Sequence, residues 1–111
     1  MVSFRMMNKL IRSTGRLTKL MQSRKTRDDS EIMQICAIMV DDLRQMQDEL
    51  KPMIEALDNY EQRMVLTLRY LKGYVYPLIA DYMNIDVRTV YKYLKLGKEK
   101  MSELFPGMIE Q

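Results

Sequence analysis

The cationic side chains of residues 87–100 are the groups in this sequence best suited to binding a ligand. The stretch holds five Lys or Arg residues and one acidic residue, Glu99. Arg88, Lys92 and Lys95 recur at spacings of four and three, which places them on one face of a helix. A helix with such a face suits a groove lined by phosphates.

The composition offers little for catalysis. The chain has no His and a single Cys, Cys36, which excludes a His general base, a His-ligated metal and an internal disulfide. No glycine-rich phosphate loop is present, and no apolar run approaches the length of a membrane span. We therefore expect no enzyme activity, metal, cofactor, small-molecule substrate or membrane partner. The lone Cys indicates a reducing setting, and we expect the cytoplasm.

Two short helices joined by a tight corner would present the cationic face. Residues 76–83 predict a helix with Pro77 in its first turn, where a missing N–H costs nothing. Asn84 tolerates the left-handed conformation of a tight turn, and Asp86 can cap the next helix, residues 87–100. Apolar residues supply a small core: Ile79, Ala80, Met83, Ile85, Val90 and Tyr93 or Leu94. This pattern is typical of a helix-turn-helix; an ordinary two-helix corner with a solvated basic face is the alternative.

Two more helices are expected before this corner. The start at residues 58–61 resembles a capping box, and the helix that follows should bury one stripe and end at Gly73; the stripe is Met64, Val65, Leu68 and Leu71. Residues 28–51 predict a long acidic helix, which we expect Pro52 to end. An apolar seam with steps of four and three runs along it, as in a coiled coil or helical hairpin: Ile32, Cys36, Met39, Leu43, Met46 and Leu50.

The N-terminal segment has the opposite charge. Residues 1–27 hold eight Lys or Arg and no acid, whereas residues 28–57 hold eight acids and two bases. Residues 4–22 predict an amphipathic helix, with an apolar stripe at Met7, Leu10, Leu17 and Met21. The opposite charges favour packing of the two helices, within one chain or between chains, so we expect the basic segment to neutralise the acidic helix rather than reach DNA. We favour a homodimer over an intramolecular hairpin, because helix-turn-helix proteins commonly read paired half-sites.

The sequence therefore predicts an all-α chain in three parts. A basic amphipathic N-terminal helix (1–27) and a long acidic helix for packing or dimerisation (28–51) precede a three-helix helix-turn-helix domain (52–111). No strand pattern is present, and the last four residues are expected to be frayed.

Residues 57–70, followed by Leu71-Lys72-Gly73, Ile79-Ala80 and Thr89-Val90-Tyr91, resemble region 4 of bacterial sigma factors. They resemble more closely the small sigma-region-4-like regulators of Gram-positive phages and mobile elements, including the ArpU and RinA types. The resemblance covers residues 52–104 and implies DNA binding, with RNA polymerase as a further candidate partner. Sigma-like patterns usually place Glu before the Ile-Ala pair, where this chain has Leu78. That departure removes a polar group that the family can point at DNA.

We therefore expect a sequence-specific double-stranded DNA-binding protein that regulates transcription in a phage or mobile element. Arg88 and Lys92 are candidates for base-edge contact, because Arg pairs well with guanine. The other candidates are Val87 and Tyr91 for thymine methyl groups or sugar, Lys95, Lys98, Arg69 and Lys72 for phosphate, and Thr89 beside them. The alternative is a small helical inhibitor or adaptor acting on RNA polymerase or a host nuclease, whose acidic helix grips a basic partner.

Overall fold

The computed structural model describes residues 1–23 and 30–110, and their side chains apart from those of residues 17–23, 30–32 and 110. The chain forms α1 (Phe4–Ser23), α2 (Ser30–Glu55), α3 (Tyr60–Leu66), a π-helical turn η1 (Thr67–Leu71), α4 (Tyr76–Met83), α5 (Val87–Leu104) and two short strands, β1 (Val2–Ser3) and β2 (Ile109–Glu110). The predicted all-α class is confirmed. The end of the predicted N-terminal part (1–27) and the start of the predicted acidic helix (28–51) fall on residues 24–29, which lie outside the described residues.

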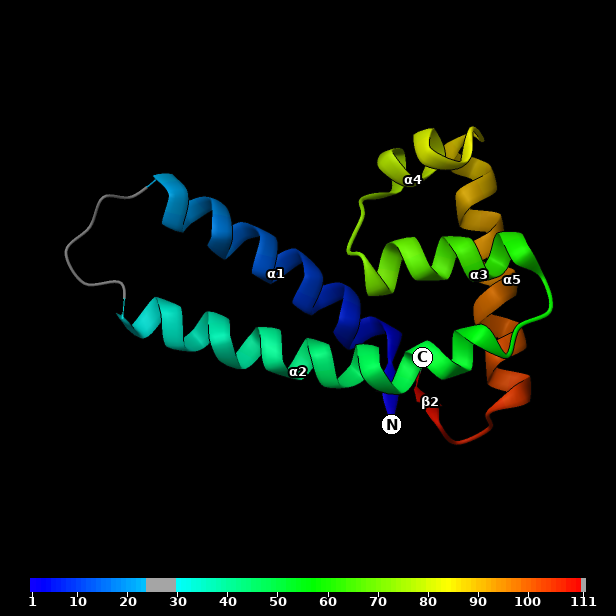
Figure 1. The fold of residues 1–111 in the computed structure, drawn as a ribbon, viewed down its shortest axis with the longest axis horizontal. Coiled ribbons are helices and arrows are strands. Elements are labelled where there is room, and N and C mark those ends of the chain that lie inside the picture. The colour runs from blue at the N-terminus through cyan, green and yellow to red at the C-terminus, as the bar shows by residue number, and fades with distance from the viewer. Residues whose placement is uncertain (24–29, 111) are drawn as a thin grey trace.

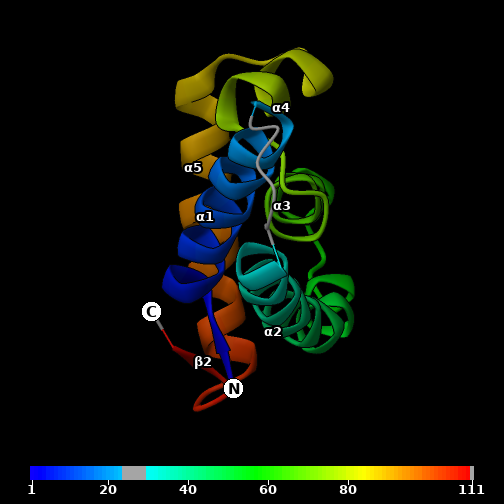
Figure 2. The ribbon, with the colours of Figure 1, turned by 90° about the vertical axis from the view of Figure 1, so that its left-hand side faces the viewer.

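The two N-terminal helices form a long antiparallel hairpin, and α3, α4 and α5 gather at its base (Figure 1). Seen end-on, α1 lies on the same side of the hairpin as α5, while α3 lies toward α2 (Figure 2). No helix in the described ranges combines the length and apolar character that crossing a bilayer requires.

One hydrophobic core joins all three predicted parts of the chain. The start of α1 contributes Phe4 and Met7, and the end of α2 contributes Leu50 and Ile54. The other buried members include Val65, Leu66, Leu68 and Tyr70 from α3 and η1, Ile79 and Ala80 from α4, and Val90, Leu94 and Met101 from α5. The base of the hairpin is thus part of the body that supports α5.

The first helix of the C-terminal unit begins and ends where the sequence predicts. The Asn59 side chain accepts a hydrogen bond from the backbone N–H of Gln62 at 2.9 Å, which caps α3. Gly73 adopts a left-handed φ of 72° after η1. A π-helical turn within this stretch was not predicted. Such turns shift the register of a helix, and this one turns both Arg69 and Tyr70 into the core.

Two expectations, one about the end of the acidic helix and one about the C-terminal residues, were wrong. Pro52 does not end the acidic helix, because α2 continues to Glu55. Pro52 is exposed, so water can satisfy the carbonyl group that loses its helical hydrogen bond, while the buried Met53 and Ile54 hold the last turn in place. The last residues are also not all frayed: Ile109 pairs in parallel with Val2 in a two-residue ladder. A ladder this short has no sequence signature, since it depends on the two chain ends meeting on the core.

Candidate nucleic-acid interface

The corner between α4 and α5 is built by local chemistry. Pro77 lies in the first turn of α4, and Asn84 at its end is left-handed with φ of 56° and ψ of 47°. The backbone N–H of Ile85 donates to the Ala80 carbonyl at 3.0 Å, which closes the turn and directs the partly buried Ile85 side chain onto the core. All of these features agree with the predicted helix-turn-helix.

Asp86 starts α5. Its carboxylate accepts hydrogen bonds from the backbone N–H and the hydroxyl of Thr89, both at 2.8 Å. These two hydrogen bonds, with a smaller contribution from the Arg88 charge, hold the pKa of Asp86 below its ordinary value. The cap therefore carries a negative charge at the helix N-terminus, where the macrodipole favours it.

Four candidate residues form one exposed surface on α5, which we call the recognition face: Arg88, Tyr91, Lys92 and Lys95. The Tyr91 ring, 52% exposed, leans on the Tyr76 ring with centroids 4.9 Å apart. That contact fixes Tyr91 in place while its edge stays in solvent. In the predicted set, Val87 and Thr89 are half-buried, with the Thr89 hydroxyl engaged by Asp86. Lys72 is exposed after η1.

Arg69 is not available to DNA, and the predicted phosphate contact of this residue is wrong. Its side chain is 3% exposed, and its guanidinium donates to Asn8 Oδ1 at 3.0 Å and to the Tyr74 carbonyl at 3.1 Å. The guanidinium also lies 4.8 Å from the centre of the Tyr76 ring. Asn8 in turn donates to the Tyr70 hydroxyl at 3.2 Å. Arg69 thus joins α1, η1 and the loop before α4 instead of facing solvent.

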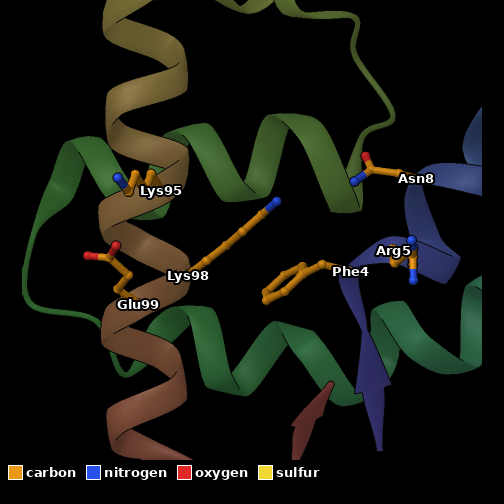
Figure 3. A pocket seen from close by; sticks show the side chains of 6 residues that line it. All are labelled: Phe4, Arg5, Asn8, Lys95, Lys98 and Glu99. Atoms are coloured by element: carbon orange, nitrogen blue, oxygen red, sulfur yellow. The ribbon is translucent and has the colours of Figure 1, made fainter. Parts of the chain in front are cut away.

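Lys98 faces the N-terminal helix rather than the recognition face. Its ammonium nitrogen lies 5.3 Å from the centre of the Phe4 ring and 5.4 Å from that of Tyr70 (Figure 3). Burial lowers the pKa of Lys98, and the Arg69 charge lowers it further, while Tyr76 acts in the opposite direction. Lys98 lines a cleft between α1 and α5, through which a phosphate could reach it.

The C-terminal part of the apolar seam packs against other elements of the same chain. Leu50 is fully buried, Leu43 and Met46 pack against the core, and Cys36 and Met39 are half-buried. Leu43 shares a groove with Ile11 and Gly15 of α1, so the helix-packing role expected of the seam is present within one chain. The side chain of Ile32, like those of Leu17 and Met21 in the predicted stripe of α1, lies outside the described residues. Homodimerisation stays a prediction.

In the described residues, the cations of α1 do not neutralise the acidic helix; the ion pair between the two segments joins the Met1 ammonium group to Glu49 at 3.3 Å. The helices pack through apolar residues, and the four described cations of α1 are all exposed: Arg5, Lys9, Arg12 and Arg16. None of them makes an ion pair within 4 Å to an acidic side chain that the structure describes, a set that leaves out Asp28, Asp29 and Glu31. The sequence signal was their spacing of four, three and four, which places all of them on one side of the helix.

Gly97 in α5 has a packing role that the sequence pattern did not indicate. A Cβ atom there would lie 2.9 Å from Leu66 Cδ1, and Leu66 is fully buried. The missing side chain lets α5 approach α3 closely, which sets how far the recognition face stands out from the core.

A comparison with known protein families agrees with this geometry. Residues 53–101 match the model of the family described as Sigma-70, region 4. No curated protein and no solved structure matches the chain. The matched segment runs from the last turn of α2 to near the end of α5, and it contains the corner and the recognition face. The C-terminal part of the chain therefore carries a helix-turn-helix domain of the Sigma-70 region 4 type, which is a DNA-binding type of domain.

Proposed function

We propose that this protein is a sequence-specific regulator of transcription that places the N-terminal half of α5 in the major groove of double-stranded DNA. The observation that carries the proposal is the recognition face. Arg88 and Lys92 are exposed on a helix whose start is fixed by Asp86 and whose opposite side is buried through Val90 and Leu94. A rigid cationic helix of this kind suits base edges and phosphates together.

We assign base reading to Arg88 and Lys92, and phosphate contact to Lys95 and Lys72. To Tyr91 and the half-buried Val87 we assign contacts with sugar or thymine methyl groups. The resemblance to ArpU- and RinA-type regulators supports a role in a phage or mobile element, and the partner, DNA, supports action in the cytoplasm. The resemblance also supports RNA polymerase as a second partner.

Selection of bound sequences from a random duplex pool tests the proposal. We expect a defined motif, and we expect Arg88→Ala to relax preference at one position of it and to weaken binding by about 1–3 kcal/mol. Lys100→Ala is the matched control, since it also removes an exposed cation from α5 but at a position outside the recognition face. Enrichment of no motif by the unaltered protein would contradict sequence-specific binding.

We also propose that the protein acts as a homodimer, through the outward sides of α2. Between residues 32 and 40 the only polar side chain is Gln34, and the exposed fractions of Met33, Ile35 and Ile38 are 56%, 52% and 63%. A helix that is apolar on all sides is normally covered. A second copy supplies a matching apolar surface.

Sedimentation of the purified chain tests the dimer. We expect a dimer that Ile38→Glu converts to a monomer, while Leu104→Glu, at an exposed apolar position on α5, leaves it intact. A wild-type protein that sediments as a monomer across the concentration range would contradict the dimer. In that case the same apolar surface would favour the second candidate function, an adaptor or inhibitor whose target is RNA polymerase or a host nuclease.

A further inference from the structure

The cations of α1 form a second basic surface, which we call the basic stripe: Arg5, Lys9, Arg12 and Arg16. The stripe spans residues 5–16, which is about 16 Å of helix. Its four side chains are exposed, and α1 contains no acidic residue. Four neighbouring charges of one sign repel each other, so the surface is stabilised by an anionic partner that offers several charges in a row.

A cleft between α1 and α5 connects the stripe to the helix that carries the recognition face. Phe4, Arg5 and Asn8 line the cleft from α1, and Lys95, Lys98 and Glu99 line it from α5 (Figure 3). Its volume is about 680 Å³. Lys95 belongs to the recognition face and Arg5 to the basic stripe, so the cleft brings the two surfaces together.

The cleft also contains a cation without a counter-ion. The Lys98 side chain is half-buried, and no carboxylate of the described residues lies within 4 Å of its ammonium group. The two aromatic rings beneath it orient the charge but do not neutralise it. An anion entering the cleft would restore the interaction that burial removes, and the lowered pKa of Lys98 agrees with this unmet need.

We propose that α1 is part of the DNA interface: the basic stripe and the α1–α5 cleft bind phosphates of the same duplex that α5 enters. The inference rests on the proposed function and adds a second row of backbone contacts to it. Over about 16 Å of the duplex axis one strand presents about five phosphates, so the stripe is long enough to meet several of them beyond the groove that α5 occupies. In this arrangement α5 contacts the bases, and α1 adds phosphate contacts that do not depend on the DNA sequence.

The apolar side of α1 argues for DNA over a lipid surface. A helix that lies in a membrane interface must insert its apolar side chains. In α1, Phe4, Met7 and Leu10 are buried in the core of the protein and are not free to insert. The charges that remain suit a rigid polyanion.

A pair of charge-matched double variants tests the proposal. Arg12→Gln/Arg16→Gln removes two charges from the basic stripe, and Arg44→Gln/Lys51→Gln removes two exposed charges from α2. Binding of the wild type and of each double variant to a duplex carrying the selected motif is measured by fluorescence anisotropy, at salt concentrations from about 50 to about 300 mM. We expect the α1 variant to flatten the slope of log affinity against log salt by about 1.8, or about 0.9 for each lost phosphate contact. The α2 variant should keep the wild-type slope, and both should keep the wild-type motif.

Equal slopes for the wild type and the α1 variant would overturn the inference and leave the proposed function standing. A similar loss in both variants would overturn it too, because net charge alone would then explain the effect. Absence of salt-dependent binding by the wild type would overturn the inference together with the proposed function. Lys98→Met probes the cleft separately, since it keeps the stem on the rings and removes the charge; we expect a further decrease in slope of about 0.9.

Discussion

Two arginines, Arg88 and Arg69, show how differently two regions of this protein use the same side chain. Arg88 stands exposed on α5, beyond a corner whose turn and cap are made by neighbours in the sequence. Arg69 is buried at the junction of η1 with α1, where Asn8, from the far end of the chain, accepts its hydrogen bond. The sequence predicted both as DNA contacts. Whether a cationic side chain is exposed depends on which other elements pack against its helix.

At the junction, the charged Arg69 side chain is buried and joins two parts of the fold instead of facing solvent. Arg69, Asn8 and Tyr70 form a chain of hydrogen bonds that ties the hairpin to the helix-turn-helix, and every buried side-chain nitrogen and oxygen of the described residues has a partner. The Tyr76 ring lies between Arg69 and Tyr91, so this junction also supports the recognition face from behind. The recognition face, by contrast, keeps its cations exposed to solvent.

The largest expected effect separates the two arginines. Arg69→Ala should lower the free energy of unfolding by about 2–4 kcal/mol, because it leaves a cavity and two acceptors without their donor. Arg88→Ala should change it by less than about 0.5 kcal/mol. Urea unfolding followed by circular dichroism measures both. Equal stabilities of the two variants would show that the junction does not hold the fold.

Gly97 tests the contact between α3 and α5. Gly97→Ala should destabilise the protein by about 1–3 kcal/mol, because its methyl group meets the buried Leu66, even though Ala favours helices. Gly15→Ala in α1 is the matched control: nothing lies within 4 Å of its Cβ position, so we expect a gain of up to about 1 kcal/mol. The two substitutions should therefore have opposite signs in thermal denaturation. Stabilisation by both would mean that α3 and α5 are less closely packed.

Asp86 tests the corner alone. Asp86→Ala removes the cap of α5 and should lower the unfolding midpoint, while Asp86→Asn should keep most of it, because an amide oxygen can still accept from Thr89. The pKa of Asp86 is lower in the folded protein, so its contribution is present at neutral pH. That contribution is lost as the pH falls below the ordinary value of 3.8 and through the lower folded value. The experiment compares the free energy of unfolding of the wild type with that of Asp86→Ala. If the difference between them stays constant from neutral pH down to about pH 2, this linkage is contradicted.

Lys95 should show the smallest effect. Lys95→Ala is expected to weaken binding to all duplexes alike and to flatten the salt slope by about 0.9, with no change in the selected motif. Anisotropy titrations on the selected duplex and on a scrambled duplex give the comparison. A loss confined to the selected duplex would move Lys95 from phosphate contact to base reading.

Most of the C-terminal unit was predictable from its residues. Pro77, Asn84, Asp86 and Gly73 act through their own backbone or that of a near neighbour, so their roles can be read from short stretches. The continuation of α2 through Pro52 could not be read in this way, because it depends on which side of the helix faces solvent. The pairing of Ile109 with Val2 and the burial of Arg69 depend on residues more than sixty positions apart.

The order of the helices, the tight corner and the segregation of charge all follow from the amino-acid sequence by itself, because helical periodicity, capping and turn preferences are local. Only the tertiary structure decided which cations face outward. Packing of α1 against η1 and α5 buried Arg69 and half-buried Lys98, while it left the basic stripe of α1 in solvent beside the recognition face. The physical reason is that burial of an apolar side of a helix determines where all its other side chains point, whatever their charge.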